Sequence, residues 1–256
     1  MKRILLANDD GADSPGLQAA YEALAPLGQV TLVAPNSQES GASHAITLET
    51  PLRAAKLSDE RGYRVWGHPA DCVKLALDQF FPDGPPDLVV SGINQGSNGG
   101  VLVHYSGTVA AAKEATLQGY AAMAISLCQW KDPEYAASAK VLRLVAERLL
   151  ANPLPRGVLL NVNVPKGPYE DLKGLRWTRQ SLAPLSDLYE RREDPRGRAY
   201  YWLSGTGPFR GDAERDDLIA VEKGYVALTP LRVDWTDESS YGGGGGGLLG
   251  DGALPK

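Results

Sequence analysis

The sequence has few of the residues on which several classes of protein depend. It contains two cysteines in 256 residues, Cys72 and Cys128, and both lie in apolar segments. This excludes a disulfide framework and a zinc site built from cysteine alone, and it indicates a reducing compartment. No apolar run approaches the roughly 20 residues that a membrane-spanning helix needs, and the N-terminus lacks the pattern of a signal peptide. We therefore expect a soluble cytoplasmic protein without a membrane partner.

An excess of basic residues is also missing. The chain has 26 Lys and Arg against 31 Asp and Glu, a formal charge of -5. A protein that binds a nucleic-acid duplex normally carries a basic stripe, so this class is not expected here. Small anionic ligands can still bind through local sites. The length suffices for one large core with an excursion.

Strand and helix patterns alternate over the first two thirds of the chain. Apolar runs predict buried strands at 3–8, 30–34, 63–67, 87–91, 121–127 and 158–164. Between them, helical patterns cover 15–27, 69–80, 108–118 and 134–151. Ser14 followed by Pro15 is a typical helix start. The alternation predicts an α/β fold with a doubly wound, mostly parallel sheet and right-handed crossovers.

The pattern changes after Pro165. Aromatic segments at 175–178 and 200–203 predict hairpin strands, 216–222 a short helix, and 225–233 a strand that returns to the core. Six consecutive glycines at 242–247 are entropically costly to order, so we expect a mobile tail. We divide the chain into an α/β core with the active site (1–165), a β-rich appendage and return segment (166–238), and the tail (239–256).

Two adjacent acids, Asp9 and Asp10, follow the first predicted strand. They can simply form a turn. However, polar loops also follow the second strand (37–43) and the strand at 87–91 (91–99), and the carboxyl ends of parallel strands meet at one edge of the sheet. Two acids that converge there repel each other unless a cation lies between them. The available oxygen ligands favour Mg²⁺, Mn²⁺ or Ca²⁺.

The segment 104–108, His-Tyr-Ser-Gly-Thr, lies immediately before a predicted helix. Free N–H groups at a helix N-terminus bind phosphate, and Ser106 and Thr108 add hydroxyl groups. An ordinary serine or threonine N-cap is the alternative. The glycine-rich GINQGSNGG at 92–100 is a weak signal by itself and is not a Walker loop.

Together these motifs are more specific than any one of them. NDDG, PNSQESGAS, GHPADCVKLAL, SGINQGSNG and YSGTVAAAKEA resemble, in order and spacing over residues 1–165, the stationary-phase survival protein SurE family of metal-dependent 5'-nucleotidases. The resemblance implies a Rossmann-like core and hydrolysis of nucleoside 5'-monophosphates, with 3'-nucleotides or short polyphosphate as related substrates. It also implies a homodimer or homotetramer in which a C-terminal β-hairpin or extension is exchanged between subunits.

The resemblance further implies roles for individual residues. One divalent ion per subunit, Mg²⁺ or Mn²⁺, would be held by Asp9, Asp10, Ser40 and Asn94. Phosphate contacts would come from Asn8, Asn98, Ser106, Gly107 and Thr108. Asn8, Asp9 and Thr108 are the expected catalytic residues, with Asp9 taking the proton of the attacking water.

Three alternatives and three histidines stay open. A receiver-type Mg²⁺-binding signalling domain also has an acidic pair after its first strand, but it needs a later phosphoacceptor Asp, where this chain has Ser91 and Asn94. A dinucleotide-binding oxidoreductase needs glycines where the acids stand. A phosphatase that forms a phosphorylated Asp9 would keep the same fold and the same metal.

The roles of the three histidines also stay open. His68 replaces the family's usual threonine and suits a helix cap or a pocket wall. His44 and His104 can shuttle protons or bond to backbone.

Overall fold

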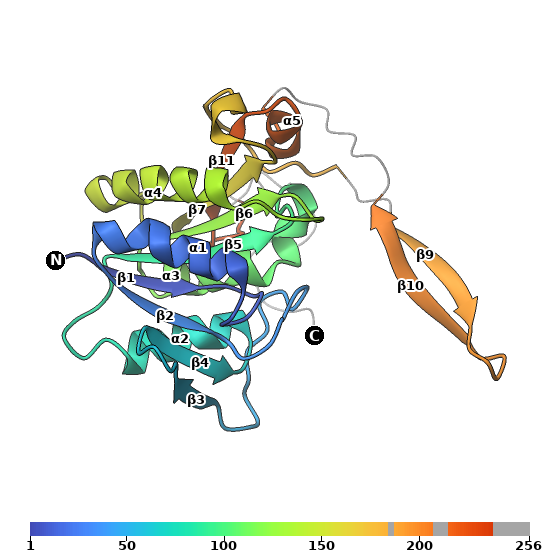
Figure 1. Cartoon of the computed structure of the whole chain (residues 1–256), viewed down its shortest axis with the longest axis horizontal. Coiled ribbons are helices and arrows are strands. Elements are labelled where there is room, and N and C mark those ends of the chain that lie inside the picture. The colour runs from blue at the N-terminus through green and yellow to red at the C-terminus, as the bar shows by residue number, and fades with distance from the viewer. Residues whose placement is uncertain (184–186, 207–214, 238–256) are drawn as a thin grey trace, which may run out of the picture.

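The computed structural model of the chain describes residues 1–183, 187–206 and 215–237, and a nine-stranded sheet lies at its centre (Figure 1). Its strand order is β3-β4-β2-β1-β5-β6-β7-β11-β8. The strands are β1 (Arg3–Ala7), β2 (Gln29–Pro35), β3 (Arg53–Lys56), β4 (Gly62–Trp66), β5 (Leu88–Gln95), β6 (Ala122–Cys128), β7 (Val158–Pro165), β8 (Leu175–Trp177) and β11 (Val226–Arg232). The strands from β4 to β7 are parallel, and β3 and β11 run antiparallel to their inner neighbours. The predicted fold class is confirmed.

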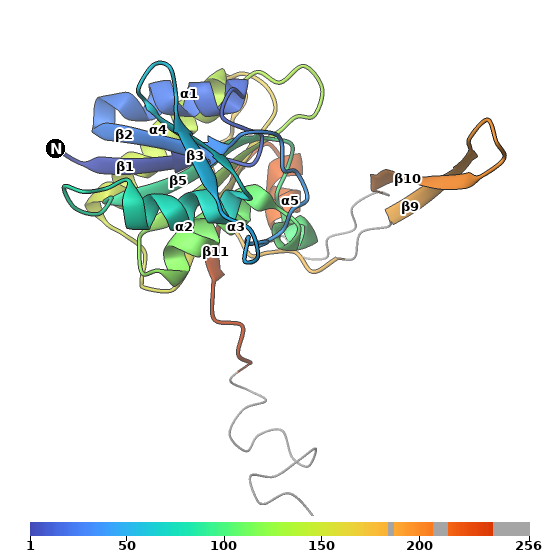
Figure 2. The same ribbon diagram turned by 90° about the horizontal axis from the view of Figure 1, so that it is seen from below.

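Helices cover both faces of the sheet (Figure 2). One layer holds α1 (Pro15–Leu24) and α4 (Ala136–Ala151), and the other holds α2 (Pro69–Gln79) and α3 (Gly107–Leu117). Alternate residues of β1 supply the two cores, with Ile4 and Leu6 in one and Leu5 and Ala7 in the other. Because β1 is apolar toward both faces, it reads as a continuous run, which is why the sequence predicted it correctly.

Helix α1 shows how local sequence fixes an element. Ser14 is its N-cap, and the Ser14 hydroxyl accepts a hydrogen bond from the Leu17 backbone N–H at 3.3 Å. Pro15 occupies the first helical position, where its missing N–H costs nothing. The helix ends at Leu24 and continues as a short 3-10 turn (Ala25–Leu27). The predicted helix is confirmed.

Two expectations about strands were wrong, and one strand was not predicted. The segment at 175–177 does not form a hairpin: it is β8, an edge strand parallel to β11. Aromatic, half-exposed residues are typical of any edge strand, so this pattern did not distinguish the two pairings. Residues 91–95 lie inside β5 rather than in the loop after it. Strand β3 was not predicted, because all four of its residues are exposed and it lacks a buried face.

The return segment behaves as predicted. Helix α5 (Asp217–Glu222) leads into β11, which pairs with β7 and so brings the chain back into the main sheet. The sheet therefore takes two of its strands, β8 and β11, from beyond residue 165.

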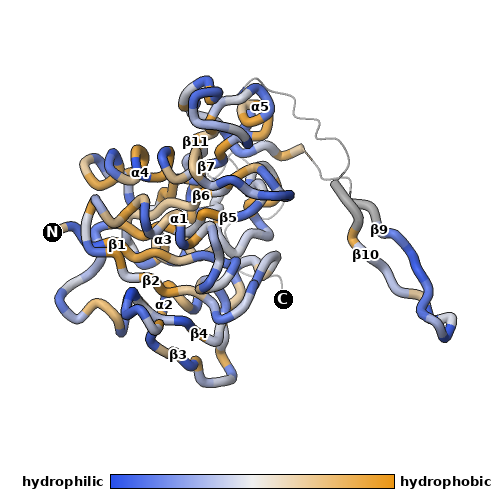
Figure 3. Tube along the Cα trace, in the orientation of Figure 1, coloured by the Kyte–Doolittle hydropathy of each residue, from blue (hydrophilic) through white to orange (hydrophobic). Residues whose placement is uncertain are grey.

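A two-stranded hairpin extends away from the body of the protein (Figure 1). It consists of β9 (Asp187–Glu193) and β10 (Ala199–Thr206), so the strand expected at 200–203 is confirmed as part of a hairpin. The central strands are mainly apolar, whereas much of β9 is hydrophilic (Figure 3). The glycine-rich tail predicted to be mobile lies outside the described residues. Among the described helices, none combines the length and apolar character needed to cross a membrane.

The chain order places a switch point between β1 and β5. From β1 the chain builds outward through β2 to β4, then returns to add β5 on the opposite side of β1. Loops from the two strand ends consequently diverge and leave a crevice at the carboxyl edge of the sheet. The acidic pair stands at this position.

Candidate active site

The end of β1 and the end of β5 are joined through the acidic pair. The backbone N–H of Gln95 donates to Asp10 Oδ2 at 3.2 Å. The loop after β2 also reaches this point, because the Glu39 N–H donates to the Asp9 carbonyl at 2.7 Å. The structure thus brings together three of the polar segments that the sequence placed at strand ends.

Asp9 is buried against the first turn of α3. Its side chain is 3% exposed, and the Thr108 hydroxyl donates to Asp9 Oδ1. A Cβ atom on Gly107 would lie 2.8 Å from Asp9 Cβ, closer than any side chain tolerates. Glycine at 107 therefore lets the helix N-terminus approach the carboxylate, and this contact explains why Gly107 and Thr108 occur together.

Burial disfavours negative charge on both acids. Desolvation raises the pKa of Asp9 from 3.8 to about 6, and the neighbouring Asp10 charge adds to the increase. Burial also raises the pKa of Asp10. Neither carboxylate forms an ion pair with another described residue. Asp9 is buried and Asp10 is half-buried, so their negative charges are costly without a positive partner, and a bound cation would offset this cost.

Asn8 holds the acidic turn in place. Its Nδ2 donates to the Gly11 carbonyl at 3.0 Å and to the Ser14 hydroxyl at 2.7 Å. Its Oδ1 is buried and has no hydrogen-bond partner among the described residues. An unpaired buried acceptor is unfavourable, and a carbonyl oxygen suits a cation rather than a phosphate oxygen. In this arrangement Asn8 offers the site an oxygen ligand, while its amide nitrogen is already occupied.

The two other candidate ligands are adjacent in sequence to Gln95 and Glu39, whose backbone N–H groups donate to the acidic pair. Asn94 is buried near the end of β5, where its Nδ2 donates to the Gly96 carbonyl at 2.8 Å. Ser40 is exposed in the loop after β2, and its hydroxyl accepts from Gln38 Nε2 at 3.0 Å. Within the described residues, no group of three or more His, Cys, Asp and Glu side chains is placed to bind a metal. A metal here would rely on two carboxylates and neutral oxygens, which fits a hard cation.

Helix α3 begins at Gly107, directly after the segment that we predicted to bind phosphate. Ser106 is the N-cap, and its hydroxyl accepts from the Val109 N–H at 3.0 Å. Both interpretations of the sequence are therefore compatible, because a capping serine leaves the other first-turn N–H groups free for an anion. The N-terminal end of this helix also supplies partial positive charge beside Asp9.

Asn98 is held by residues that the sequence reasoning missed. Its Nδ2 donates to the Ser126 hydroxyl at 2.9 Å, and its backbone N–H donates to Asn163 Oδ1 at 2.9 Å. Asn161 Nδ2 completes the set by donating to the Asn98 carbonyl at 2.8 Å. These contacts fix the glycine-rich loop on β6 and β7. One sequence feature could have identified Asn161 and Asn163 in advance: they are two asparagines at alternate positions of an otherwise apolar strand, VLLNVNV.

Two histidines pair with carboxylates rather than with backbone. His44 Nε2 lies 2.9 Å from Glu114 Oε2, and Lys74 Nζ lies 3.1 Å from the other oxygen of Glu114. His68 Nδ1 lies 3.0 Å from Glu39 Oε2 at the N-terminus of α2. Both pairs tie the loop that carries Ser40 to the helices beneath it.

The Glu114 network predicts a pH dependence of stability. The His44 hydrogen bond is the main reason why the pKa of Glu114 falls from 4.5 to about 2. A depressed pKa adds stability above pH 4.5, and this stability is lost as the pH falls toward about 2. Glu114→Gln should therefore lower the free energy of unfolding by about 1–3 kcal/mol at neutral pH and by less below about pH 3. Urea unfolding at both pH values measures this, and an equal loss at both would contradict it.

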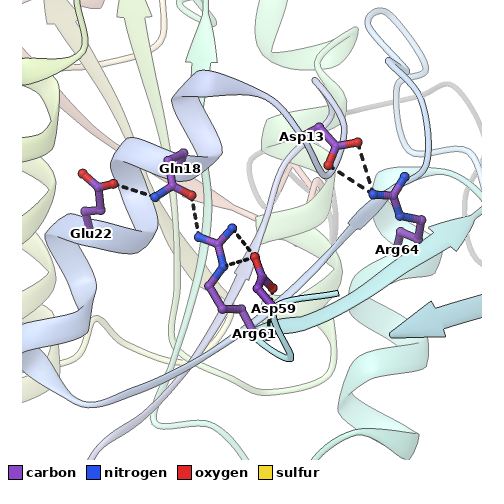
Figure 4. Close-up of polar contacts among 6 residues, drawn as sticks. All are labelled: Asp13, Gln18, Glu22, Asp59, Arg61 and Arg64. Atoms are coloured by element: carbon purple, nitrogen blue, oxygen red, sulfur yellow. Dashed lines mark hydrogen bonds and ion pairs between the residues drawn. The ribbon is translucent and has the colours of Figure 1, made fainter. Parts of the chain in front are cut away.

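A third acid in the same turn is engaged elsewhere. Asp13 is exposed and pairs with Arg64 of β4 at 3.1 Å (Figure 4). The neighbouring Arg61 contacts Gln18 and Asp59, which extends this polar surface along α1 (Figure 4). Asp13 therefore lies close to the acidic pair in sequence but serves a surface ion pair.

Cysteine is not a candidate nucleophile. Burial raises the pKa of the Cys72 thiol, and it raises that of Cys128 to about 12. Both thiols remain protonated at neutral pH, so neither can attack phosphorus as a thiolate. The chemistry of the site rests on oxygen.

Comparisons of the sequence and of the structure with known proteins point to one family. The family model described as Survival protein SurE matches residues 4–187. The chain is 44% identical over 236 residues to 5'-nucleotidase SurE of Alkalilimnicola ehrlichii, covering 92% of this chain and 91% of the relative. It is 43% identical to 5'-nucleotidase SurE of Vibrio cholerae, covering 93% and 94%. The crystal structure of SurE protein from Aquifex aeolicus superposes with a TM-score of 0.84 at 38% identity, covering 93% of this chain and 96% of that one.

Proposed function

The chain belongs to the SurE family, and from this premise we propose that it is a divalent-metal-dependent 5'-nucleotidase that hydrolyses nucleoside 5'-monophosphates to nucleoside and phosphate. The relatives named 5'-nucleotidase SurE support this activity. The observation that carries it here is the acidic pair at the end of β1, in which the buried Asp9 contacts the first turn of α3 and the half-buried Asp10 contacts the end of β5. A candidate cation ligand therefore lies beside a helix N-terminus, which is a kind of site that can bind phosphate.

We assign the metal to Asp9, Asp10, Ser40 and Asn94, with the unpaired Asn8 carbonyl oxygen as a further donor. The fit rests on one buried and one half-buried carboxylate that lack a positive partner among the described residues, and on ligands that are all oxygen. Mg²⁺ or Mn²⁺, one ion per subunit, suits this set. When bound, the ion supplies positive charge that stabilises the phosphoryl oxygens and activates water.

The protein groups supply the remaining electrostatic stabilisation. The free N–H groups of the first turn of α3 and the hydroxyls of Ser106 and Thr108 face the position of the phosphoryl group in this proposal. Charge spreads over the equatorial phosphoryl oxygens in the transition state, so fixed donors at that position lower the barrier. We assign to Asp9 the role of accepting the proton of the attacking water, because its carboxylate lies at the first turn of α3, next to the position proposed for the phosphoryl group.

Thr108→Val tests the donor at the helix terminus. The variant keeps the shape of the side chain and removes its hydroxyl, so kcat/KM for a nucleoside 5'-monophosphate should fall by roughly 10- to 100-fold. This fall should persist at saturating metal, because Thr108 is not itself a ligand, although its hydroxyl donates to the proposed ligand Asp9. Loss of metal binding with unchanged kcat/KM would show that Thr108 serves the metal site instead. Thr116→Val is a matched control on the same helix, where the hydroxyl donates to the Ala112 carbonyl.

The proposal requires a single displacement by water. If both acids hold the ion, neither carboxylate is free to attack phosphorus in line, so no phosphorylated enzyme should form. We expect inversion at a chiral phosphorus and an unmodified N-terminal peptide after acid quench and borohydride reduction. Retention, or a reduced Asp9 or Asp10, would favour the route through an aspartyl phosphate.

We also propose that subunits assemble as a homodimer or homotetramer through an exchanged C-terminal segment. The β9–β10 hairpin supports this, because it stands away from the body of the protein (Figure 2) and because it has large aromatic side chains that are exposed. The residues are Tyr189, Tyr201 and Trp202. An exposed aromatic surface of this kind is typical of an interface. Sedimentation of the intact chain and of a Tyr201→Ser, Trp202→Ser variant would measure its contribution.

The activity itself is tested on the intact protein with a panel of substrates. Nucleoside 5'-monophosphates, 3'-monophosphates and short polyphosphate should be compared after chelation and after restoring each metal. We expect hydrolysis of 5'-monophosphates to disappear with chelator and to return with Mg²⁺ or Mn²⁺. Full activity in excess chelator would contradict the proposal.

A further inference from the structure

The loop that carries Asn98 also contacts the return segment of the chain, through the side chain of Asp217. Asp217 is the first residue of α5 and is fully buried. Its Oδ2 accepts a hydrogen bond from the Gly100 backbone N–H at 2.8 Å. Its Oδ1 accepts from the backbone N–H groups of Ser181 at 3.2 Å and of Leu218 at 2.9 Å. One carboxylate therefore joins this loop to the segment after β8 and to the start of α5, and the mechanism above does not use it.

Gly100 lies between two groups of proposed phosphate contacts. Asn98 precedes it by two residues in the sequence. A short 3-10 helix (Gly100–His104) begins at Gly100 and leads to Ser106, the N-cap of α3. A shift of Gly100 would therefore move both Asn98 and the first turn of α3.

The two glycines of this loop pack closely against α5. A Cβ atom on Gly99 would lie 2.5 Å from Leu218 Cδ2, and one on Gly100 would lie 2.9 Å from Leu218 Cδ1. Gly100 also has a φ of +58°, a conformation that residues with a side chain rarely adopt. Glycine at both positions therefore permits the loop to come within hydrogen-bonding distance of Asp217.

A carboxylate is costly to bury, and here backbone groups offset the cost. Burial raises the pKa of Asp217 above its usual 3.8, and the N–H groups of Gly100, Ser181 and Leu218 oppose this increase. Among the described residues, no basic side chain forms an ion pair with Asp217. Hydrogen bonds from N–H groups to a charged acceptor are stronger than those to a neutral one. The bond to Gly100 is therefore a firm attachment of the loop.

Asp217 is itself held in a fixed position. The segments 179–181 and 215–217 flank the β9–β10 hairpin in the sequence, and they meet at an isolated bridge between Arg179 and Asp216. The Asp217 N–H donates to the Arg179 carbonyl at 3.0 Å, and the Arg179 N–H donates to the Arg215 carbonyl at 2.9 Å. A side chain can position a functional loop only when its own backbone is fixed, and this one meets that condition.

We propose that Asp217 is a positioning residue, whose bond to the Gly100 N–H keeps Asn98 and the first turn of α3 in place for the phosphoryl group. This inference rests on the proposed function, because it takes Asn98 and α3 as the phosphate contacts. Asp217 touches neither the phosphoryl group nor the metal in that function. Its loss should therefore weaken the binding of phosphate and leave the binding of metal intact.

Asp217→Asn tests this assignment. Asparagine has the same size, and its one acceptor oxygen can keep the bonds from Ser181 and Leu218, whereas its NH₂ group cannot accept from Gly100. Because small displacements at an active site have large effects, kcat/KM for AMP should fall about 10- to 100-fold, and the inhibition constant of inorganic phosphate should rise about tenfold. The affinity for Mn²⁺, measured by calorimetry, should equal that of the wild type.

Asp216→Asn is the matched control. It removes one negative charge at the neighbouring position, the N-cap of α5, where the side chain makes no capping hydrogen bond. All three quantities should keep their wild-type values in this variant. Wild-type inhibition by phosphate in Asp217→Asn would overturn the proposal, as would an equal loss of affinity for phosphate and for Mn²⁺. If the wild type neither hydrolyses AMP nor binds phosphate with any metal, the proposed function fails and this inference fails with it.

A second measurement uses only the wild type, so it does not depend on the folding of a variant. If the Asp217 contact favours phosphate binding, then phosphate binding must favour the contact to the same extent. With Mg²⁺ present, inorganic phosphate should therefore slow hydrogen exchange of the Gly100 and Ser181 amides, which both donate to Asp217. Unchanged exchange at either amide, at a phosphate concentration that inhibits AMP hydrolysis, would overturn the proposal.

Discussion

Asp9→Asn is expected to lower nucleotide hydrolysis by about a thousandfold or more, because it removes a metal ligand and the proton acceptor together. The same change should stabilise the metal-free protein at neutral pH. Burial raises the pKa of Asp9 from 3.8 to about 6, so ionisation opposes folding once the pH exceeds 3.8. The full cost, about 3 kcal/mol, is reached above about pH 6. A neutral amide does not have this cost.

Thermal unfolding separates the two effects. Without metal, Asp9→Asn should melt above the wild type at about pH 8 and close to it below about pH 4. With Mg²⁺ at the higher pH, the wild type should gain stability while the variant gains little, because only the wild type binds the ion. If the melting temperatures of both proteins depend on pH and on metal in the same way, then burial does not raise the pKa of Asp9 and Asp9 is not a metal ligand.

Asp10→Asn is expected to abolish metal-dependent activity while leaving the fold intact. An amide of the same shape can still accept a hydrogen bond from the Gln95 N–H, so the join between β1 and β5 should persist. The neutral amide cannot balance the charge of a divalent ion. The affinity for Mg²⁺ or Mn²⁺ should therefore fall by about 10- to 100-fold or more. Initial rates across a range of metal concentrations measure this loss.

The chain offers a matched control in the same turn. Asp13→Asn also removes one negative charge, but Asp13 is exposed and pairs with Arg64. It should keep the metal affinity and rate of the wild type, since a surface ion pair contributes little. Equal loss in Asp10→Asn and Asp13→Asn would mean that net charge near the site, not direct ligation, controls metal binding.

The sequence predicted the parts of the fold where one pattern dominates. Strand β1 is apolar toward both cores, and α1 has both an N-cap and a first-turn proline. The edge strands were harder because their environment is mixed. Strand β3 is fully exposed, and β8 has only three residues whose partner, β11, lies about fifty residues later. A local sequence pattern cannot predict the pairing of β8 with a strand so far along the chain.

The residues of the candidate site also fall into those that local sequence predicts and those that only the tertiary structure brings together. The acids, the helix cap and the order of the motifs were visible in the sequence, since each has a local spacing. The supporting contacts depend on tertiary structure: Asn161 and Asn163 hold the Asn98 loop, and Glu114 receives His44 from another element. Asp217 and Gly100 are more than one hundred residues apart, and only the fold brings them into contact.

Calorimetric titration of Mn²⁺ into the chelator-treated intact protein tests the central claim most directly, namely that Asp9 and Asp10 together hold the catalytic ion. The wild type and Asp13→Asn should each bind one ion per chain with similar affinity. The double variant Asp9→Asn, Asp10→Asn should show no binding in the same range, although circular dichroism should show that it is folded. Binding of one ion per chain by the double variant, with the affinity of the wild type, would contradict the claim.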